Sequence, residues 1–151
     1  MRLMGLDYGS RTVGVALSDE LLVTAQPREI IRRDRESKIR KTLARIEELI
    51  VAENVKAVVC GLPLNMDDSA GERAQRAQEF AEMVHRRTGL PVYLQDERLT
   101  TVESDEIMDA AGIRSGDRKQ YVDMIAAGII LQEYMDNHPE ELAAWRAGAV
   151  L

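Results

Sequence analysis

The sequence predicts an α/β fold: one domain built on a mixed five-stranded sheet with helices on both faces. Two observations support this prediction. The first part of the chain holds three β-prone runs joined by short connections, which is typical of antiparallel strands. The rest alternates short apolar runs with amphipathic helical patterns, and that alternation predicts parallel strands linked by helical crossovers. A length of 151 residues is enough for one domain with a full core.

The three N-terminal strands are predicted at residues 2–8, 12–18 and about 22–31. The first two are apolar, and the short GSR connection between them is typical of a hairpin. The third contains Pro27, which cannot donate a hydrogen bond to a neighbouring strand. We therefore expect the third strand to lie at an edge of the sheet.

Two amphipathic helices are predicted further along the chain. The first carries apolar residues at spacings of four, three and four, which places them on one face. The second begins near Gly71 and ends before Gly89 and Pro91, because Gly and Pro terminate helices. The apolar residues of the first helix are Ile39, Leu43, Ile46 and Ile50.

The two remaining strands are predicted at 55–61, VKAVVCG, and at 91–97, PVYLQDE. The former is a continuous apolar run, which is typical of a strand covered on both faces. A capping box at 100–103 indicates a helix that runs to about residue 111. A last helix is expected over about 118–136.

No repeat, low-complexity segment or linker divides the chain. We therefore expect residues 1–151 to form a single domain, with residues 136–151 as an acidic C-terminal tail of unassigned role. No apolar run approaches the ~20 residues of a membrane helix, and the N-terminus lacks the apolar stretch of a signal peptide. The sequence predicts a cytoplasmic protein without a membrane partner. Cys60, the only cysteine, is expected to be a buried apolar residue.

Charge is distributed unevenly along the chain. The net charge of −6 argues mildly against a non-specific nucleic-acid binder, which usually has a positive balance. Residues 28–45, however, hold eight Lys or Arg against three acids. A local basic face on an acidic protein therefore stays open, although charge alone favours a solvated helix face.

Acidic residues occupy positions where the pattern predicts burial. Asp7 ends the first strand, Asp96 and Glu97 end the last strand, and another acid lies in the apolar helix segment YVDMIAAGIIL. Functional sites of α/β proteins lie at the carboxyl ends of strands. The small residues that follow Asp123 would let its helix approach the sheet closely, and we expect this to bring Asp123 near Asp7.

Each acid alone also has a structural explanation. Asp7 could stabilise the turn that follows it, and Glu97 could bind backbone amides. Asp123 could pair with Lys119, four residues earlier on the same helix. Together, however, buried carboxylates repel one another, and a divalent cation would remove that cost. Oxygen ligands without His or Cys indicate Mg²⁺ or Mn²⁺ rather than Zn²⁺.

Four segments occur in a recognisable order: GLDYGSRTVGVALSD, VVCGLPLNMDDSAGERAQRAQEFA, DERLTTVE and RKQYVDMIAA. Together they resemble the YqgF/RuvX family, whose members are described as Holliday junction resolvases and as pre-16S rRNA nucleases. The resemblance spans about residues 3–135. It implies an RNase H-like fold, in agreement with the predicted order of elements. It also implies three metal-binding catalytic acids, which fall on Asp7, Glu97 and Asp123 in the matching motifs.

The resemblance leads to a mechanistic hypothesis, the Mg²⁺-dependent hydrolysis of a phosphodiester, with Mn²⁺ as a substitute. Two ions about 3.5–4 Å apart would clamp the attacking water and the leaving oxygen. Asp7 would bridge both ions, and Glu97 and Asp123 would hold one each. By resemblance, the products carry 5′-phosphate and 3′-hydroxyl ends. The candidate contacts to nucleic acid are Arg11, Asn65, Arg73, Arg76, Arg98, Arg118 and Lys119.

Processing of the 5′ end of pre-16S rRNA in ribosome biogenesis is the favoured function, with pre-rRNA and ribosomal precursor particles as partners. Resolution of Holliday junctions in DNA recombination or repair is the alternative. A resolvase that cuts two symmetric strands should be a homodimer, whereas an rRNA-processing enzyme can be a monomer. Two other classes stay open: a non-catalytic nucleic-acid-binding module that uses residues 28–45, and a fragment of an actin-like ATPase, suggested by DYGSRTVG.

Overall fold

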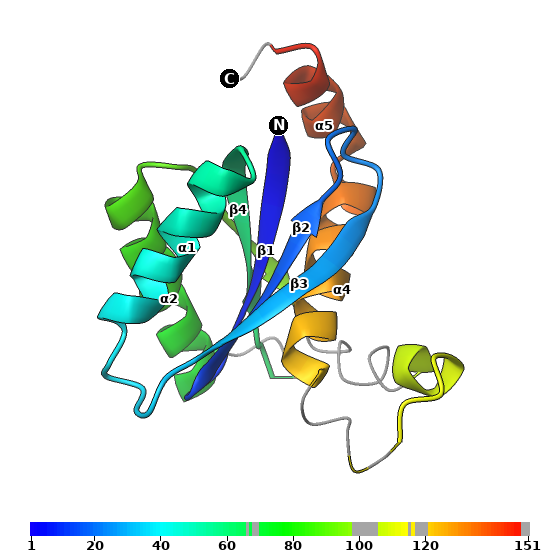
Figure 1. Ribbon diagram of the computed structural model, residues 1–151. Helices are drawn as coiled ribbons and strands as arrows, with labels where there is room; N and C mark the ends of the chain where they lie inside the picture. The colour runs from blue at the N-terminus through cyan, green and yellow to red at the C-terminus, as the bar shows by residue number, and fades with distance from the viewer. Residues whose placement is uncertain (66, 68–69, 98–105, 115, 117–120, 149–151) are drawn as a thin grey trace.

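The computed structural model describes residues 1–65, 67, 70–97, 106–114, 116 and 121–148. The elements follow one another in nearly the predicted order (Figure 1). Along the chain they are β1 (Arg2–Tyr8), β2 (Thr12–Ser18), β3 (Ala25–Arg32), α1 (Arg40–Ala52), β4 (Val55–Leu62), α2 (Glu72–Thr88), β5 (Val92–Asp96), α4 (Val122–Asn137) and α5 (Pro139–Arg146).

The strands form one five-stranded sheet in the order β3-β2-β1-β4-β5. β1 pairs antiparallel with β2, and β2 with β3, whereas the β1–β4 and β4–β5 pairs are parallel. The predicted mixed sheet is therefore confirmed. β3 lies at an edge, as Pro27 indicated, and the β2–β3 ladder shifts its register next to the pair formed by Ala16 and Pro27.

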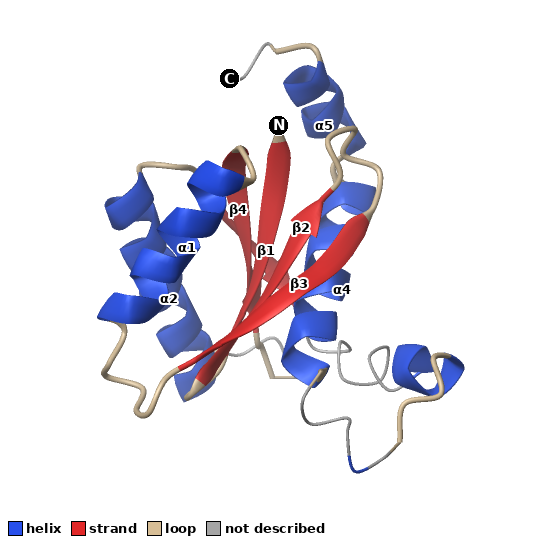
Figure 2. Ribbon diagram, in the orientation of Figure 1, coloured by secondary structure: helices blue, strands red, loops and turns tan. Residues whose placement is uncertain are grey.

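Helices cover both faces of the sheet, as predicted (Figure 2). α1 and α2 pack on one face, where Leu6, Ile46 and Phe80 belong to one buried cluster. α4 and α5 pack on the other face, where Leu3 and Leu131 belong to a second buried cluster. Successive side chains of β1 therefore face opposite helical layers, because side chains alternate along a strand.

The carboxyl ends of four strands meet at one edge of the sheet. β1, β4 and β5 are parallel, and β3 has the same direction because β3 and β1 are both antiparallel to β2. α1 and α2 begin at this edge, since they follow β3 and β4 along the chain. We call it the carboxyl edge, and it is where α/β proteins place their functional sites.

β3 begins later than predicted, at Ala25 rather than near residue 22. The chain before it turns around Asp19, whose carboxylate accepts hydrogen bonds from the amides of Val23 and Thr24 at 2.7 and 3.0 Å. An Asp side chain that binds nearby amides favours a turn over a strand. The apolar residues of this turn gave the sequence the pattern of a longer strand.

The acidic tail contains a helix that the sequence pattern does not predict, α5. It begins with Pro139, which suits the first turn of a helix, and Glu140 and Glu141 complement the positive end of the helix dipole. Leu142 and Trp145 are buried and extend the second core cluster. A helix of eight residues is too short to show a clear periodicity. The described part of the tail therefore belongs to the fold.

The last long helix is described from Val122, and the first residues predicted for it, 118–120, lie outside the described residues. The capping box at 100–103 also lies outside them. Residues 106–110 are helical, which agrees with a helix that runs to about residue 111. Within the described part of the chain, no helix has the length and apolar character needed to cross a membrane.

Candidate active site

Asp7 lies near the carboxyl end of β1, the central strand, and its side chain faces α4. Its neighbours Leu6 and Tyr8 face α1 and α2 instead, because side chains alternate along the strand. Burial raises the pKa of Asp7 to about 6, a hydrogen bond from Glu97 opposes the rise, and the charge of Asp123 adds to it. The first strand thus delivers a half-buried carboxylate to the carboxyl edge.

Asp123, in the first turn of α4, comes close to Asp7 because the strands beneath α4 carry glycine. Gly14 of β2 pairs with Asp7 in the ladder, and a Cβ at Gly14 would overlap the backbone carbonyl of Asp123. Further along, a Cβ at Gly5 would lie 2.7 Å from the carbonyl oxygen of Ala127. α4 can therefore lie directly on β1 and β2. The expected approach of Asp123 to Asp7 is confirmed, since the charge of one carboxylate acts on the other.

Thr12 holds the side chain of Asp123, although no sequence motif indicates this role. The Thr12 hydroxyl donates a hydrogen bond to Oδ2 of Asp123. The Thr12 carbonyl accepts a hydrogen bond from the amide of Gly9 at 2.8 Å, which closes the hairpin turn. Thr12 and Gly14 share one face of β2 because they are two residues apart. This shared face is the only sequence signal for a contact between Thr12 and Asp123. The signal can be interpreted only when α4 is known to pack on that face of β2.

Glu97 follows β5 directly and reaches Asp7 across β4. A Cβ at Gly61 of β4 would lie 2.6 Å from Oε2 of Glu97, so this path requires glycine. Burial raises the pKa of Glu97 to about 9, and both the charge of Asp7 and a hydrogen bond with Asp7 add to the rise. A hydrogen bond between two carboxyl groups requires a proton between them, and the larger rise in pKa favours Glu97 as the donor and Asp7 as the acceptor.

Three acidic side chains from distant parts of the chain thus meet at the carboxyl edge. Glu97 is hydrogen-bonded to Asp7, and Asp123 is hydrogen-bonded to Thr12. Among the residues that the structure describes, no three His, Cys, Asp or Glu side chains lie close enough together to be ligands of one ion. A proton shared by Glu97 and Asp7 and a hydroxyl donor at Asp123 lower the cost of placing the three acids near one another.

The chemistry of these acids fits a divalent cation. A cation competes with protons for carboxylate oxygens, so it would displace the proton of Glu97 and remove the repulsion between the acids. The donor atoms are all oxygens, which suits Mg²⁺ or Mn²⁺. Asp7, Glu97 and Asp123 would hold the cation, and Thr12 would orient Asp123 as a partner behind the ligand.

The predicted nucleic-acid contacts fall into three groups. Arg11 is exposed in the hairpin turn next to the carboxylates, and Asn65 lies in the loop between β4 and α2. Arg73 and Arg76 lie at the start of α2, where both pair with Glu36. Three predicted contacts lie outside the described residues, namely Arg98, Arg118 and Lys119.

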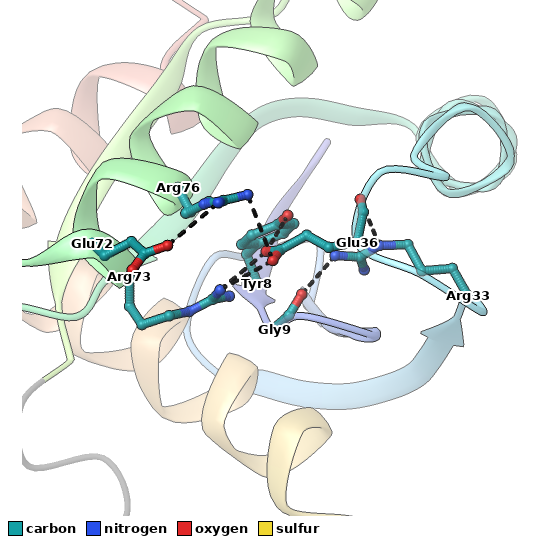
Figure 3. A network of polar contacts seen from close by, with 7 residues as sticks. All are labelled: Tyr8, Gly9, Arg33, Glu36, Glu72, Arg73 and Arg76. Atoms are coloured by element: carbon teal, nitrogen blue, oxygen red, sulfur yellow. Dashed lines mark hydrogen bonds and ion pairs between the residues drawn. The ribbon is translucent and has the colours of Figure 1, made fainter.

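Arg73 and Arg76 belong to a polar network on the other side of β1 (Figure 3). At its centre, the carboxylate of Glu36 accepts hydrogen bonds from the hydroxyl of Tyr8 at 2.8 Å and from Arg73 at 3.1 Å. Arg76 lies 3.7 Å from the same carboxylate. The ring of Tyr8 stacks on Phe80 with 4.5 Å between the ring centres. The residue after Asp7 thus connects the carboxyl edge to the layer of α1 and α2.

Arg33 ties this network to the turn that follows Asp7 (Figure 3). Its guanidinium lies over the ring of Tyr8, 4.9 Å from the ring centre, and donates a hydrogen bond to the carbonyl of Gly9 at 2.6 Å. Its backbone amide donates to the carbonyl of Arg11 at 2.8 Å. The sequence gives no local signal for Arg33, because its contact with Gly9 joins residues 24 positions apart.

Proteins similar to this chain are found by sequence. The family described as "RuvX: Holliday junction resolvase" matches residues 1–137. A protein of Agathobacter rectalis named "Putative pre-16S rRNA nuclease" is 57% identical over 136 residues, which cover 90% of this chain and 95% of that protein. A protein of Lachnospira eligens with the same name is 54% identical over 137 residues, which cover 91% of this chain and 98% of that protein.

Solved structures that share the fold are more distant in sequence. RuvC of Thermus thermophilus in complex with Holliday junction substrate has a TM-score of 0.61 at 15% identity, over 93% of this chain and 96% of that chain. The fowlpox virus resolvase in complex with Holliday junction DNA has a TM-score of 0.55 at 12% identity, over 91% of this chain and 98% of that chain. These likenesses show the fold alone, and the predicted RNase H-like fold is confirmed.

Proposed function

Because this chain belongs to the RuvX family, we propose that it is a nuclease that hydrolyses phosphodiester bonds with the help of divalent cations. Its proposed catalytic residues and cation ligands are Asp7, Glu97 and Asp123. One observation supports this assignment above the others: acids from β1, the end of β5 and α4 meet at the carboxyl edge, and the pKa values of Asp7 and Glu97 are raised there. Strongly perturbed acids that cluster at such an edge are typical of functional sites.

The favoured substrate is the 5′ end of pre-16S rRNA, with products that carry 5′-phosphate and 3′-hydroxyl ends. The names of relatives that are 57% and 54% identical over most of their length support this choice. The net charge of −6 suits a transient, cytoplasmic enzyme that acts on ribosomal precursor particles better than a tight binder of DNA. Residues 1–151 would form one nuclease domain.

Resolution of Holliday junctions is the second candidate function. The description of the family and the fold shared with two junction-bound resolvases favour it. A resolvase must cut two symmetric strands, so this function requires a two-fold dimer in solution. The oligomeric state therefore discriminates between the two candidates.

The residues of the chain divide the work of hydrolysis. Bound Mg²⁺, for which Mn²⁺ can substitute, would activate water and neutralise charge on the phosphate. Glu97 must release its proton before it can serve as a ligand. Thr12 keeps Asp123 aimed at the carboxyl edge through its hydroxyl. Gly14 and Gly61 leave the room that Asp123 and Glu97 need beside the central strand.

A cleavage assay tests the proposal. Wild type, Asp7→Asn and the control Asp136→Asn would each be incubated with a labelled precursor rRNA leader or a four-way DNA junction, in Mg²⁺ or in EDTA. We expect the wild type and the control to cleave in Mg²⁺ only. Asp7→Asn should lose activity by roughly 10³-fold or more. Cleavage that persists in EDTA, or that Asp7→Asn leaves intact, would contradict the mechanism.

The same assay chooses the substrate. Cleavage of the rRNA leader by a monomer supports rRNA processing. Symmetric cleavage of the junction by a dimer, with the leader left intact, supports the second candidate. Sedimentation of the purified chain in solution supplies the oligomeric state.

A further inference from the structure

The basic segment 28–45 separates into two parts in the structure. At the ends of the segment the arginines are paired: Arg45 donates two hydrogen bonds to Glu29, at 2.8 and 3.0 Å, and Arg28 lies 3.8 Å from Glu53. In the middle of the segment, other basic residues make no ion pair with any described residue. These unpaired residues are Arg32, Arg35, Lys38, Arg40 and Lys41.

Four of the unpaired residues line a groove, together with Arg33. The groove has a volume of about 680 Å³ and lies between the end of β3 and the start of α1. Five basic residues face one acid in it, although the whole chain is acidic. We call it the basic groove, and its charged lining residues are Arg32, Arg33, Asp34, Lys38, Arg40 and Lys41.

The start of α1 strengthens the positive field of this groove. Its first turn contains no acid, and its N-cap residue Ile39 offers no side-chain acceptor to the free amides. Arg40 and Lys41 lie there although cations at a helix N-terminus are unfavourable. Side-chain cations and helix dipole therefore point to the same kind of ligand, a polyanion.

The basic groove lies close to the candidate active site. β3 ends at the carboxyl edge, and Arg33, which lines the groove, is bonded to the carbonyl of Gly9, two residues after Asp7. Asp7 and Tyr8 are neighbours whose side chains face opposite helical layers. A nucleic-acid strand that crosses the carboxyl edge would therefore pass from the acids on one side of β1 to the basic groove on the other.

We propose that the basic groove binds the phosphate backbone of the nucleic acid next to the point of cleavage. The proposal rests on the proposed nuclease function, and it assigns to the loop before α1 the role of holding the substrate strand. Charge complementarity supports a nucleic acid as the occupant, because unpaired Lys and Arg contacts to phosphates supply affinity that is independent of base sequence.

Glu36 limits the positive charge that this surface presents. Its carboxylate binds Arg73 and lies 3.7 Å from Arg76, so both cations are partly neutralised beside the groove (Figure 3). A backbone phosphate could take the place of this carboxylate between the two arginines. Removal of the Glu36 charge should therefore strengthen binding of nucleic acid, which is the opposite effect to removal of groove cations.

The first test measures binding without cleavage. A labelled single-stranded RNA of precursor sequence would be titrated with full-length protein in EDTA at several salt concentrations. Arg40→Ala/Lys41→Ala removes two groove charges. The control Lys56→Ala/Arg86→Ala removes two exposed charges, one near the start of β4 and one near the end of α2, both away from the carboxyl edge. For two lost phosphate contacts, the slope of log K against log salt should become shallower by about 1.4. The control pair should keep the wild-type slope.

A second pair of variants tests the role of Glu36. Glu36→Gln should raise the affinity for the same RNA several-fold at low salt. The control Glu47→Gln breaks a similar pair, with Arg87 at 2.6 Å, and should leave the affinity near that of wild type. Equal effects of the groove pair and its control, or weaker binding by Glu36→Gln, would overturn the proposal, as would the absence of RNA binding by wild type.

The proposal and the nuclease function can fail separately. Suppose that wild type cleaves RNA in Mg²⁺ and that Arg40→Ala/Lys41→Ala binds and cleaves RNA equally well. This result would overturn the proposed role of the groove and leave the nuclease function intact. Suppose instead that wild type never cleaves RNA, but that its RNA binding depends on the groove cations. This result would overturn the nuclease function and support the groove as a binding site.

Discussion

Asp7 and Glu97 are ordinary acids whose surroundings change their chemistry. Burial is the first cause in both cases, and it raises the pKa of Asp7 to about 6 and that of Glu97 to about 9. The two side chains share a hydrogen bond, so the proton of Glu97 stabilises the charge of Asp7. At this scale the site is a set of acids whose pKa values are raised by burial and by one another's charge.

A substitution at Thr12 tests how Asp123 is positioned. Thr12→Val keeps the shape of the side chain but removes the hydroxyl that binds Asp123. We expect activity and Mg²⁺ affinity to fall about 10–100-fold, as for partners behind metal ligands. Thr12→Ser, which keeps the hydroxyl, should restore most of both, and this rescue separates a positioning role from a packing role. Both readouts come from steady-state cleavage at varied Mg²⁺.

Thr42 provides the matched control for Thr12→Val. Its Oγ1 is buried and has no hydrogen-bond partner among the residues that the structure describes. Thr42→Val therefore removes an unsatisfied group, and we expect it to leave activity unchanged and to raise stability by about 1 kcal/mol. Equal losses of activity in the two valine variants, measured in the same assay, would contradict the role given to Thr12.

At the scale of elements, the site depends on the close contact between α4 and the sheet. A Cβ at Gly61 would crowd Glu97, and one at Gly14 would overlap the backbone of Asp123. Both glycines lie in strands that the apolar pattern predicts correctly. The pattern cannot show which strand residue a distant helix touches, so the need for glycine at these positions appears only in the folded chain.

Gly14→Ala tests this packing. The new methyl group would displace the first turn of α4, and we expect a loss of about 1–3 kcal/mol in stability together with loss of cleavage. The control is Gly128→Ala, which lies in α4 itself, where a Cβ would meet Pro27 at an ordinary 3.7 Å. Urea unfolding of both variants provides the measurement. If Gly14→Ala is as stable and as active as Gly128→Ala, then the close contact between α4 and β2 at Gly14 is not required.

Other elements show the same division between local and distant signals. β1, β2 and β4 were predicted within a residue or two because their apolar runs and bounding turns are local. α5 was missed because eight residues carry too little periodicity, and its place depends on Leu142 and Trp145 meeting the second core cluster. Asp7 and Asp123 were identified as a pair by burial and by motif, whereas Thr12 and Arg33 depend on tertiary contacts that no local pattern reports.

At the scale of the whole molecule, the buried acids link stability to pH. An acid whose pKa is higher in the folded protein than in the unfolded chain keeps its proton at pH values at which the unfolded chain has already lost it. The unfolded state then binds fewer protons, so stability falls as pH rises. The ordinary values for Asp7 and Glu97 are 3.8 and 4.5, and the folded values are about 6 and about 9.

The metal-free protein should therefore lose stability as the pH rises from about 4.5 to about 9. Asp7→Asn should reduce this loss more than the control Asp136→Asn, which removes the same charge far from the carboxyl edge. Mg²⁺ should restore stability most at high pH, where fewer protons compete with it. Thermal unfolding in EDTA and in Mg²⁺ measures both effects. A Tm in EDTA that rises between pH 5 and pH 8 would contradict the expectation.

The central claim is that Asp7, Glu97 and Asp123 together hold a divalent cation. Calorimetric titration of Mn²⁺ into the metal-free protein tests it most directly, with wild type, Asp7→Asn and the control Asp136→Asn at the same pH. We expect saturable binding by wild type and by Asp136→Asn, and loss of that binding in Asp7→Asn. Equal binding by all three proteins, or no binding by wild type, would contradict it.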